Sequence, residues 1–146
     1  SVIKSNKIRS DLLAKRLSII MKNKVQNKVI SFLGVTSKAN TDDMRDSSSL
    51  KLIPYLSKRG AKIKYYDPTG KKKEFEKLKN VEFSKTIKES INNSDVVILH
   101  TDWNDFKSIN FKKFSKNKKL IIYDMRNIFS PSKIKKLGLK YFGIGR

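Results

Sequence analysis

Cysteine is absent from this 146-residue sequence, and histidine occurs only once. The first absence excludes disulfides, thiolate metal sites and catalysis by a thiol nucleophile. The second leaves His100 without a partner ligand at metal-binding spacing, so a packed or hydrogen-bonded histidine is favoured. We therefore predict no metal site and no catalytic residue in this chain.

Long apolar runs are also missing. No run approaches the roughly 18 residues that a membrane-spanning helix needs, and the first residues lack the apolar segment of a signal peptide. We therefore expect a soluble, cytoplasmic protein with no membrane partner. With 38% hydrophobic residues, a chain of this length can bury one core.

Negative charge is scarce, with 13 acidic residues against 34 basic ones and a formal net charge of +21. Such an excess of cations raises nucleic acid as a partner. However, lysine accounts for 28 of the basic residues and is scattered along the whole chain, while the aromatic residues lie mostly inside apolar runs. This pattern is more typical of a compositional bias than of a dedicated nucleic-acid binder. Nucleic-acid binding therefore remains only an alternative.

Short apolar runs alternate with helical patterns along most of the sequence. Strands are expected at residues 29–35, 61–66, 95–101, 120–123 and 139–144, and helices at residues 48–59, 84–91 and 130–138. Serines 47–49, Ser84 and Ser130 are interpreted as helix caps, and lysines 71–73 as a solvated face. The alternation predicts βαβ units, and hence an α/β, Rossmann-like three-layer domain with a mostly parallel sheet.

An amphipathic helix is expected to precede this domain. Its apolar stripe consists of Ile8, Leu12, Leu13, Leu17, Ile20 and Met21, and it ends near Asn23. We assign residues 1–27 to this helix and a connector, and residues 28–146 to the domain. A helix at the edge of a domain would leave its stripe exposed, so we expect it to pack on a partner or on a second copy of the chain.

The candidate site follows from the topology. In parallel sheets, ligands bind beyond the carboxyl ends of the strands, near the point where the strand order reverses. The first strand runs into a long polar loop that carries Lys38 and Arg45, and Asp67, residues 101–103 and residues 124–126 follow later strands. Two cations in such a loop favour an anion. The aspartates at 42, 43 and 46 are interpreted as turn formers and as charge partners of Arg45.

A dinucleotide held by the usual glycine-rich loop is not favoured. Of the three glycines that this motif requires, the loop retains only Gly34, and Lys38 stands where backbone amides would meet the phosphates. A lysine side chain is better suited to a nucleoside diphosphate held by charge-assisted hydrogen bonds.

Several motifs in one order resemble a known family. The sequence reads Leu-Gly at 33–34, Lys38, Asn-Thr-Asp-Asp-Met-Arg at 40–45, Arg-Gly-Ala at 59–61, Tyr-Asp-Pro at 66–68, Thr-Asp-Trp at 101–103, Asp-Met-Arg-Asn at 124–127 and Gly-Ile-Gly-Arg at 143–146. This order resembles the C-terminal UDP-binding domain of the UDP-glucose 6-dehydrogenases, in the UDP-glucose/GDP-mannose dehydrogenase family. The resemblance covers residues 28–146, and the leading helix resembles the end of that family's central dimerisation helix.

The resemblance implies a function in two halves. It implies a domain that binds UDP-glucose or a related UDP-sugar, and a separate NAD-binding, catalytic half that oxidises UDP-glucose to UDP-glucuronate for polysaccharide biosynthesis. Lys38 and Arg126 would bind the substrate, and Arg45 would reach the NAD cofactor across the domain junction. A homodimer through the leading helix is implied as well.

The sequence departs from the family at three points. Ser37 and Ala39 flank Lys38 where the family has Phe and Pro, the catalytic cysteine has no counterpart, and no glycine-rich NAD-binding domain is present. We therefore expect no oxidation by this chain alone. A binding or interaction module that keeps the fold without the ligand, and a basic nucleic-acid-binding domain, remain as alternatives.

Overall fold

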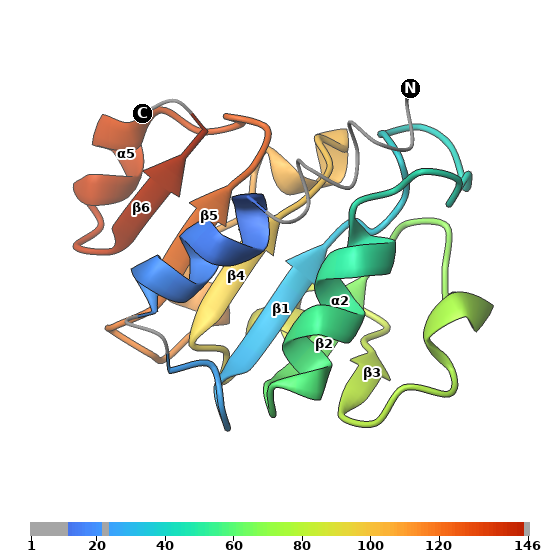
Figure 1. Cartoon of the computed structure of the whole chain (residues 1–146). Helices are drawn as coiled ribbons and strands as arrows, with labels where there is room; N and C mark the ends of the chain where they lie inside the picture. The colour runs from blue at the N-terminus through green and yellow to red at the C-terminus, as the bar shows by residue number, and fades with distance from the viewer. Residues whose placement is uncertain (1–11, 22–23, 145–146) are drawn as a thin grey trace.

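Six parallel strands form one sheet in the computed structural model, which describes residues 12–21 and 24–144 (Figure 1). The strands are β1 (Val29–Leu33), β2 (Lys62–Tyr66), β3 (Val81–Phe83), β4 (Val96–Leu99), β5 (Ile121–Asp124) and β6 (Lys140–Gly143). Their order is β3-β2-β1-β4-β5-β6, and every neighbouring pair is parallel. This topology confirms the Rossmann-like α/β fold predicted from the sequence.

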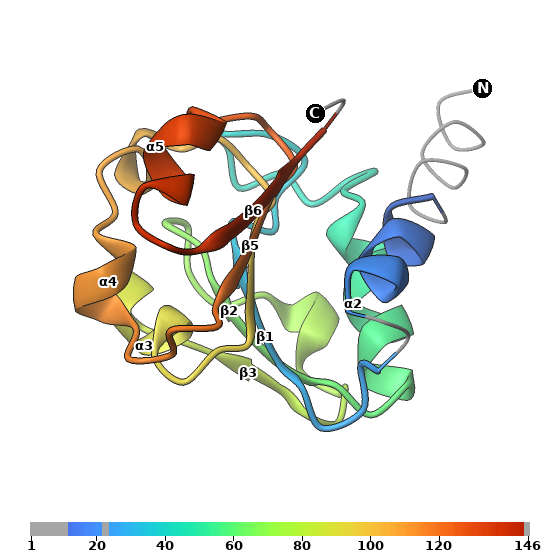
Figure 2. The ribbon, with the colours of Figure 1, turned by 90° about the vertical axis from the view of Figure 1, so that its left-hand side faces the viewer.

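Helices cover both faces of the sheet. The helical elements are residues 12–20, α2 (Ser49–Lys58), α3 (Ile87–Ile91), α4 (Phe111–Phe114) and α5 (Pro131–Lys135), with short 3-10 turns η1 (Lys73–Phe75) and η2 (Asn104–Phe106). Seen along its edge, the sheet separates α2 and the helix at residues 12–20 from α3, α4 and α5 (Figure 2). The domain therefore has three layers and two apolar cores, one on each side of the sheet.

The central strands formed where their composition predicted them. All four residues of β4 are buried, as expected for a strand covered on both faces. Strand β3 was not predicted, because its three residues, Val-Glu-Phe, alternate too briefly to stand out and only one edge of it is paired.

The expectation of an exposed stripe on the first helix is wrong for most of its described residues. Leu13, Leu17 and Met21 are buried in the same core as β1 and α2, so the domain itself covers them. Leu12 and Ile19 are 62% and 64% exposed. Ile8 and Asn23 lie outside the described residues, and pairing with a second copy stays a prediction.

Two local interpretations also need correction. Lys72 does not belong to a solvated face: it is buried, its Nζ donates to Thr69 Oγ1 at 2.5 Å and its backbone N–H donates to the Tyr65 hydroxyl at 2.8 Å. Helix α3 is capped by Thr86, whose hydroxyl accepts from the Glu89 N–H, instead of by Ser84. Ser130 does precede α5, but its hydroxyl makes no cap hydrogen bond.

Within the described part of the chain, no helix combines the length and apolarity needed to cross a bilayer. The last two residues of the Gly-Ile-Gly-Arg motif fall outside this part.

Candidate functional site

The strand order reverses between β1 and β4, and the two strands leave the sheet in close contact there. Gly34 follows β1 with a φ of +80°, and a Cβ at this position would lie 1.7 Å from Thr101 Oγ1. A left-handed backbone angle and the lack of space both require glycine. Gly34 therefore serves the packing of β1 against the chain after β4.

The loop after β1 is anchored at its base by buried polar groups. The Val35 N–H donates to the Asp67 carboxylate at 2.8 Å, and the Val35 carbonyl accepts from the hydroxyls of Ser47 and Ser49, each at 2.6 Å. Asp67, at the end of β2, also accepts from the Thr69 N–H and hydroxyl. The loop is therefore held at its start and at its return to α2.

One of the serines at the start of α2, Ser48, acts differently from the capping role predicted for it. Ser48 occupies the N-cap position, but its side chain makes no cap hydrogen bond. It bonds instead to His100 Nε2 at 2.8 Å, which links α2 to the chain after β4. The interpretation of His100 as a hydrogen-bonded histidine is confirmed.

Lys38 lies at the exposed tip of the anchored loop. The Ser37 N–H donates to the Asp43 carbonyl at 2.9 Å, which closes the loop, and the Thr36 hydroxyl donates to the Lys38 carbonyl at 2.8 Å. The backbone of Lys38 is thus fixed while its side chain is exposed to solvent. A cation placed in this way can meet an anion at the carboxyl edge of the sheet.

Arg126 joins three strand ends. From the loop after β5, its Nε donates to the His100 carbonyl at 3.0 Å and an Nη donates to the Ser37 carbonyl at 3.2 Å. The guanidinium therefore lies between the loop after β1 and the chain after β4, and the structure brings Arg126 next to the residue that precedes Lys38.

Asp124 fixes the loop on which Arg126 stands. Its buried carboxylate accepts from the backbone N–H groups of Arg126 and Phe129 and from the Tyr141 hydroxyl at 2.7 Å. Sequence reasoning left open whether Asp124 orients the arginine or simply ends a strand; the hydrogen bonds show that it orients the backbone of the loop. Tyr141 was not anticipated, because nothing local marks a partner 17 positions away.

Arg45 lies on the return arm of the loop after β1. Its guanidinium forms a salt bridge with Asp43 at 3.0 Å, and the side chain is 88% exposed. The same carboxylate accepts from the Arg45 N–H at 2.9 Å. Hydrogen bonds from the Arg45 side chain and backbone lower the pKa of Asp43 from its usual 3.8 to about 2. The interpretation of this aspartate as a turn former and charge partner is confirmed.

Two buried polar atoms near the switch point lack a hydrogen-bond partner within the described residues, Thr101 Oγ1 and Trp103 Nε1. Both belong to the Thr-Asp-Trp motif. Across residues 12–21 and 24–144, no group of three or more His, Asp or Glu side chains is placed to hold a metal ion.

Comparison with known proteins places these features in a family. The family model described as "UDP-glucose/GDP-mannose dehydrogenase family, UDP binding domain" matches residues 31–131. The chain belongs to this family. The match spans β1 to the start of α5, and therefore includes Lys38, Arg45 and Arg126. The family resemblance predicted from the sequence motifs is thereby confirmed.

Named relatives agree with this assignment. The chain is 32% identical to UDP-glucose 6-dehydrogenase of Rickettsia prowazekii over 148 aligned positions, which cover 99% of the chain but 34% of that relative. The chain thus spans about a third of the length of the curated relatives that it matches.

Solved structures show the same fold. A UDP-D-ManNAc dehydrogenase from Pyrococcus horikoshii superposes with a TM-score of 0.69 at 26% identity, covering 95% of this chain and 30% of that one. An NDP-N-acetyl-D-galactosaminuronic acid dehydrogenase from Methanosarcina mazei superposes with a TM-score of 0.74 at 22% identity, covering 99% and 28%.

Proposed function

We propose that this chain binds the UDP moiety of a UDP-sugar, UDP-glucose in the first instance, at the carboxyl edge of its sheet. The observation that carries the proposal is the position of Lys38, an exposed cation on a loop anchored at the switch point of a UDP-binding-domain fold. Ligands of open parallel sheets bind at such switch points. The relatives named UDP-glucose 6-dehydrogenase support the choice of sugar.

Each site residue has a distinct part in the proposal. Lys38 provides the charge for the diphosphate, because its ammonium is exposed while its backbone is fixed. Arg126 lies at the sugar end and also holds the loop in place through the Ser37 carbonyl. Ser37 and Ala39 beside the lysine offer small side chains, so the contact depends on charge more than on an apolar wall.

NAD enters the proposal only through another half of the enzyme. The loop after β1 has one glycine, and the packing against Thr101 occupies the space around it, so this loop does not fit a dinucleotide pyrophosphate. Arg45 fits a contact across a domain junction, because its side chain is 88% exposed and its guanidinium is oriented by the Asp43 carboxylate. The covering half would supply NAD and the catalytic cysteine for oxidation to UDP-glucuronate.

Calorimetry with UDP and UDP-glucose tests the proposal directly. We expect saturable binding to the purified chain, and a roughly ten- to hundredfold loss of affinity in Lys38→Ala, as expected for removal of one hydrogen bond to a charged group. Lys62→Ala is the matched control, because Lys62 is exposed at the opposite, amino end of β2. Its affinity should stay within about twofold of the parent.

Two results would count against the proposal. Absence of binding to a folded chain would favour a module that keeps the family fold without its ligand. Equal losses of UDP affinity in the Lys38 and Lys62 variants would mean that binding depends only on the net charge of the chain.

A further inference from the structure

Positive charge on the last part of the chain is not balanced by acidic residues. Residues 106–146 contain ten lysines and a single acidic residue, Asp124. Asp124 is fully buried and accepts three hydrogen bonds from its own surroundings, so it does not reach the surface. The surface around α4, α5 and the turns that follow them is therefore strongly cationic.

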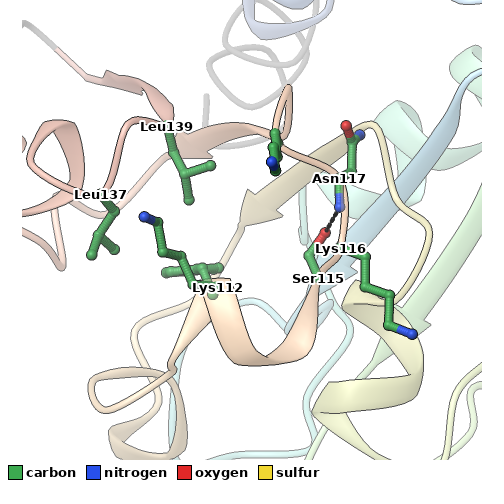
Figure 3. Close-up of a pocket in the computed structure, with 8 residues that line it drawn as sticks. Lys112, Ser115, Lys116, Asn117, Leu137 and Leu139 are labelled. Atoms are coloured by element: carbon green, nitrogen blue, oxygen red, sulfur yellow. Dashed lines mark hydrogen bonds between the residues drawn. The ribbon is translucent and has the colours of Figure 1, made fainter.

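A hollow lies in this surface, between the end of α4 and the turn before β6 (Figure 3). Its volume is about 590 Å³, and its apolar lining comes from Phe111, Leu137 and Leu139. Lys112, Lys116 and Lys118 border it. Figure 3 shows Lys112 extending toward Leu137, while Lys116 points away from the hollow.

Asn117 gives the hollow a fixed wall and connects it to a second one. Its side-chain amide donates to the Ser94 carbonyl at 3.0 Å and its oxygen accepts from the Lys119 N–H at 2.9 Å. Asn117 also lines a neighbouring hollow of about 360 Å³, which three lysines, Lys28, Lys119 and Lys140, and one acidic residue, Asp95, border. The Asp95 carboxylate accepts a hydrogen bond from the Val29 N–H at 2.9 Å, so it offsets only part of the positive charge. The two hollows meet at Asn117, near the amino ends of β4, β5 and β6, and we call them together the amino-edge groove.

We propose that the amino-edge groove binds an acidic segment of a partner protein, with an aliphatic side chain of that segment placed in the hollow of Figure 3. Charge complementarity selects an acidic partner. The aliphatic lining and the volume suit one or two leucine-sized side chains.

Nucleic acid fits this groove less well. The residues that line its two hollows include no arginine, and so no planar fork for a phosphate. Phe111 is the aromatic residue among them, and it is fully buried and offers no face on which a base can stack. The groove also lies at the amino edge, opposite Lys38 and Arg126, so occupation of one site leaves the other accessible.

Fluorescence anisotropy with three labelled probes tests this proposal. The probes are an acidic peptide that contains two leucines, the same peptide with both leucines replaced by serine, and a thymidine oligonucleotide of equal charge. We expect the leucine peptide to bind at least about fivefold more tightly than the other two, with an affinity that falls as salt rises. Equal or tighter binding of the oligonucleotide would overturn the proposal in favour of a nucleic-acid surface.

Matched charge-reversal variants locate the binding. Replacing Lys112, Lys118 and Lys119, which are exposed and line the groove, with glutamate should weaken binding of the leucine peptide about tenfold or more. Replacing Lys15, Lys51 and Lys58 with glutamate changes the net charge equally, but on exposed residues that do not line the groove, and should weaken binding of the leucine peptide less than about threefold. Equal effects of the two triple variants would overturn the proposal.

A third variant tests the apolar hollow. Leu137→Ser, at a half-buried position, should remove the preference for leucine over serine in the peptide while the chain stays folded by circular dichroism. An unchanged preference in that folded variant would contradict a role for the hollow. UDP calorimetry on all variants separates this proposal from the function assigned to the carboxyl edge, because the lysine groove variants should keep their UDP affinity.

Discussion

Arg126 donates a hydrogen bond to the Ser37 carbonyl across 89 positions of the sequence. The same guanidinium donates to the His100 carbonyl at 3.0 Å. One side chain thus connects the loops after β1 and β5 to the chain after β4, at the place where the strand order reverses. The position of the Lys38 loop therefore depends on a residue that is distant in the sequence but adjacent in the fold.

Arg126→Ala should loosen this loop before it affects the sheet. The Ser37 and His100 carbonyls lose a charged donor, so we expect unfolding free energy to fall by about 1–3 kcal/mol. Amide exchange in residues 36–44 should become faster, as measured by hydrogen exchange with mass spectrometry. Arg126→Lys keeps the charge but not the two-directional donation, so its effect should be intermediate.

Arg59→Ala is the control for the arginine experiment. Arg59 packs over the Tyr55 ring with its guanidinium carbon 3.5 Å from the ring centroid, outside the Lys38 loop. Exchange in residues 36–44 should not change in this variant. Protection that is unchanged in Arg126→Ala as well would contradict the tethering role.

Gly34→Ala should be among the most destabilising single-methyl additions in the chain. The new Cβ would meet Thr101 Oγ1 at 1.7 Å and Phe106 Cε2 at 3.2 Å, on a backbone with φ of +80°. The left-handed backbone costs about 1–2 kcal/mol and the overpacking about 1–3 kcal/mol. The free energy of unfolding, measured with urea, should therefore fall by roughly 2–5 kcal/mol. 

Gly138→Ala separates these two contributions. Gly138 has a nearly identical φ of +79°, but nothing lies within 4 Å of a Cβ built there. Its cost should therefore be the backbone strain alone, about 1–2 kcal/mol. Equal losses of unfolding free energy in Gly34→Ala and Gly138→Ala would show that the Thr101 side chain can move aside without destabilising the fold.

Two buried tyrosines make a second matched pair. The single proton of the Tyr141 hydroxyl faces two acceptors, the Asp124 carboxylate at 2.7 Å and the Phe129 carbonyl at 2.9 Å. Tyr141→Phe should therefore destabilise the domain by about 1–3 kcal/mol. The Tyr123 hydroxyl is buried without a partner among the described residues. Tyr123→Phe should therefore be neutral or slightly stabilising in thermal and urea unfolding. A larger loss at Tyr123 than at Tyr141 would contradict this assignment of the hydrogen bonds.

The sequence predicted most of the fold because burial leaves a strong pattern. Strand β4 is apolar at every position, and the loop after β1 follows directly from the end of its strand. The sequence pattern does not predict the burial of a polar residue whose hydrogen-bond partners are set by the tertiary structure. Lys72 is buried through its bonds to Tyr65 and Thr69, and nothing in three successive lysines distinguishes the middle one.

The edge that holds the candidate site was predictable for a topological reason, since parallel strands end together. The contacts within it were not. Ser48 has the residue type and position of a helix cap, yet its hydroxyl bonds His100, 52 positions away. A residue type that suits a local role also suits a distant one, so sequence alone cannot choose between them.

Asp43 should report directly on its contact with Arg45. Its pKa is lowered to about 2 by hydrogen bonds from the Arg45 side chain and backbone. A lowered pKa in the folded state means that the pair stabilises the fold above the ordinary pKa of 3.8, and that this contribution is lost as pH falls through about 2. Because the pair is exposed, the effect on unfolding should be small and should weaken with salt.

An NMR titration of the Asp43 carboxyl carbon measures this shift. In Arg45→Ala the side-chain hydrogen bond and the nearby charge disappear, so the pKa should rise toward 3.8, while the remaining bond from the backbone N–H at position 45 keeps it below that value. In Arg59→Ala the midpoint should stay near 2, because Arg59 is not among the groups that shift this pKa. A midpoint near 2 in Arg45→Ala would show that the backbone of the turn alone lowers the pKa of Asp43, and that the Arg45 side chain does not contribute to it.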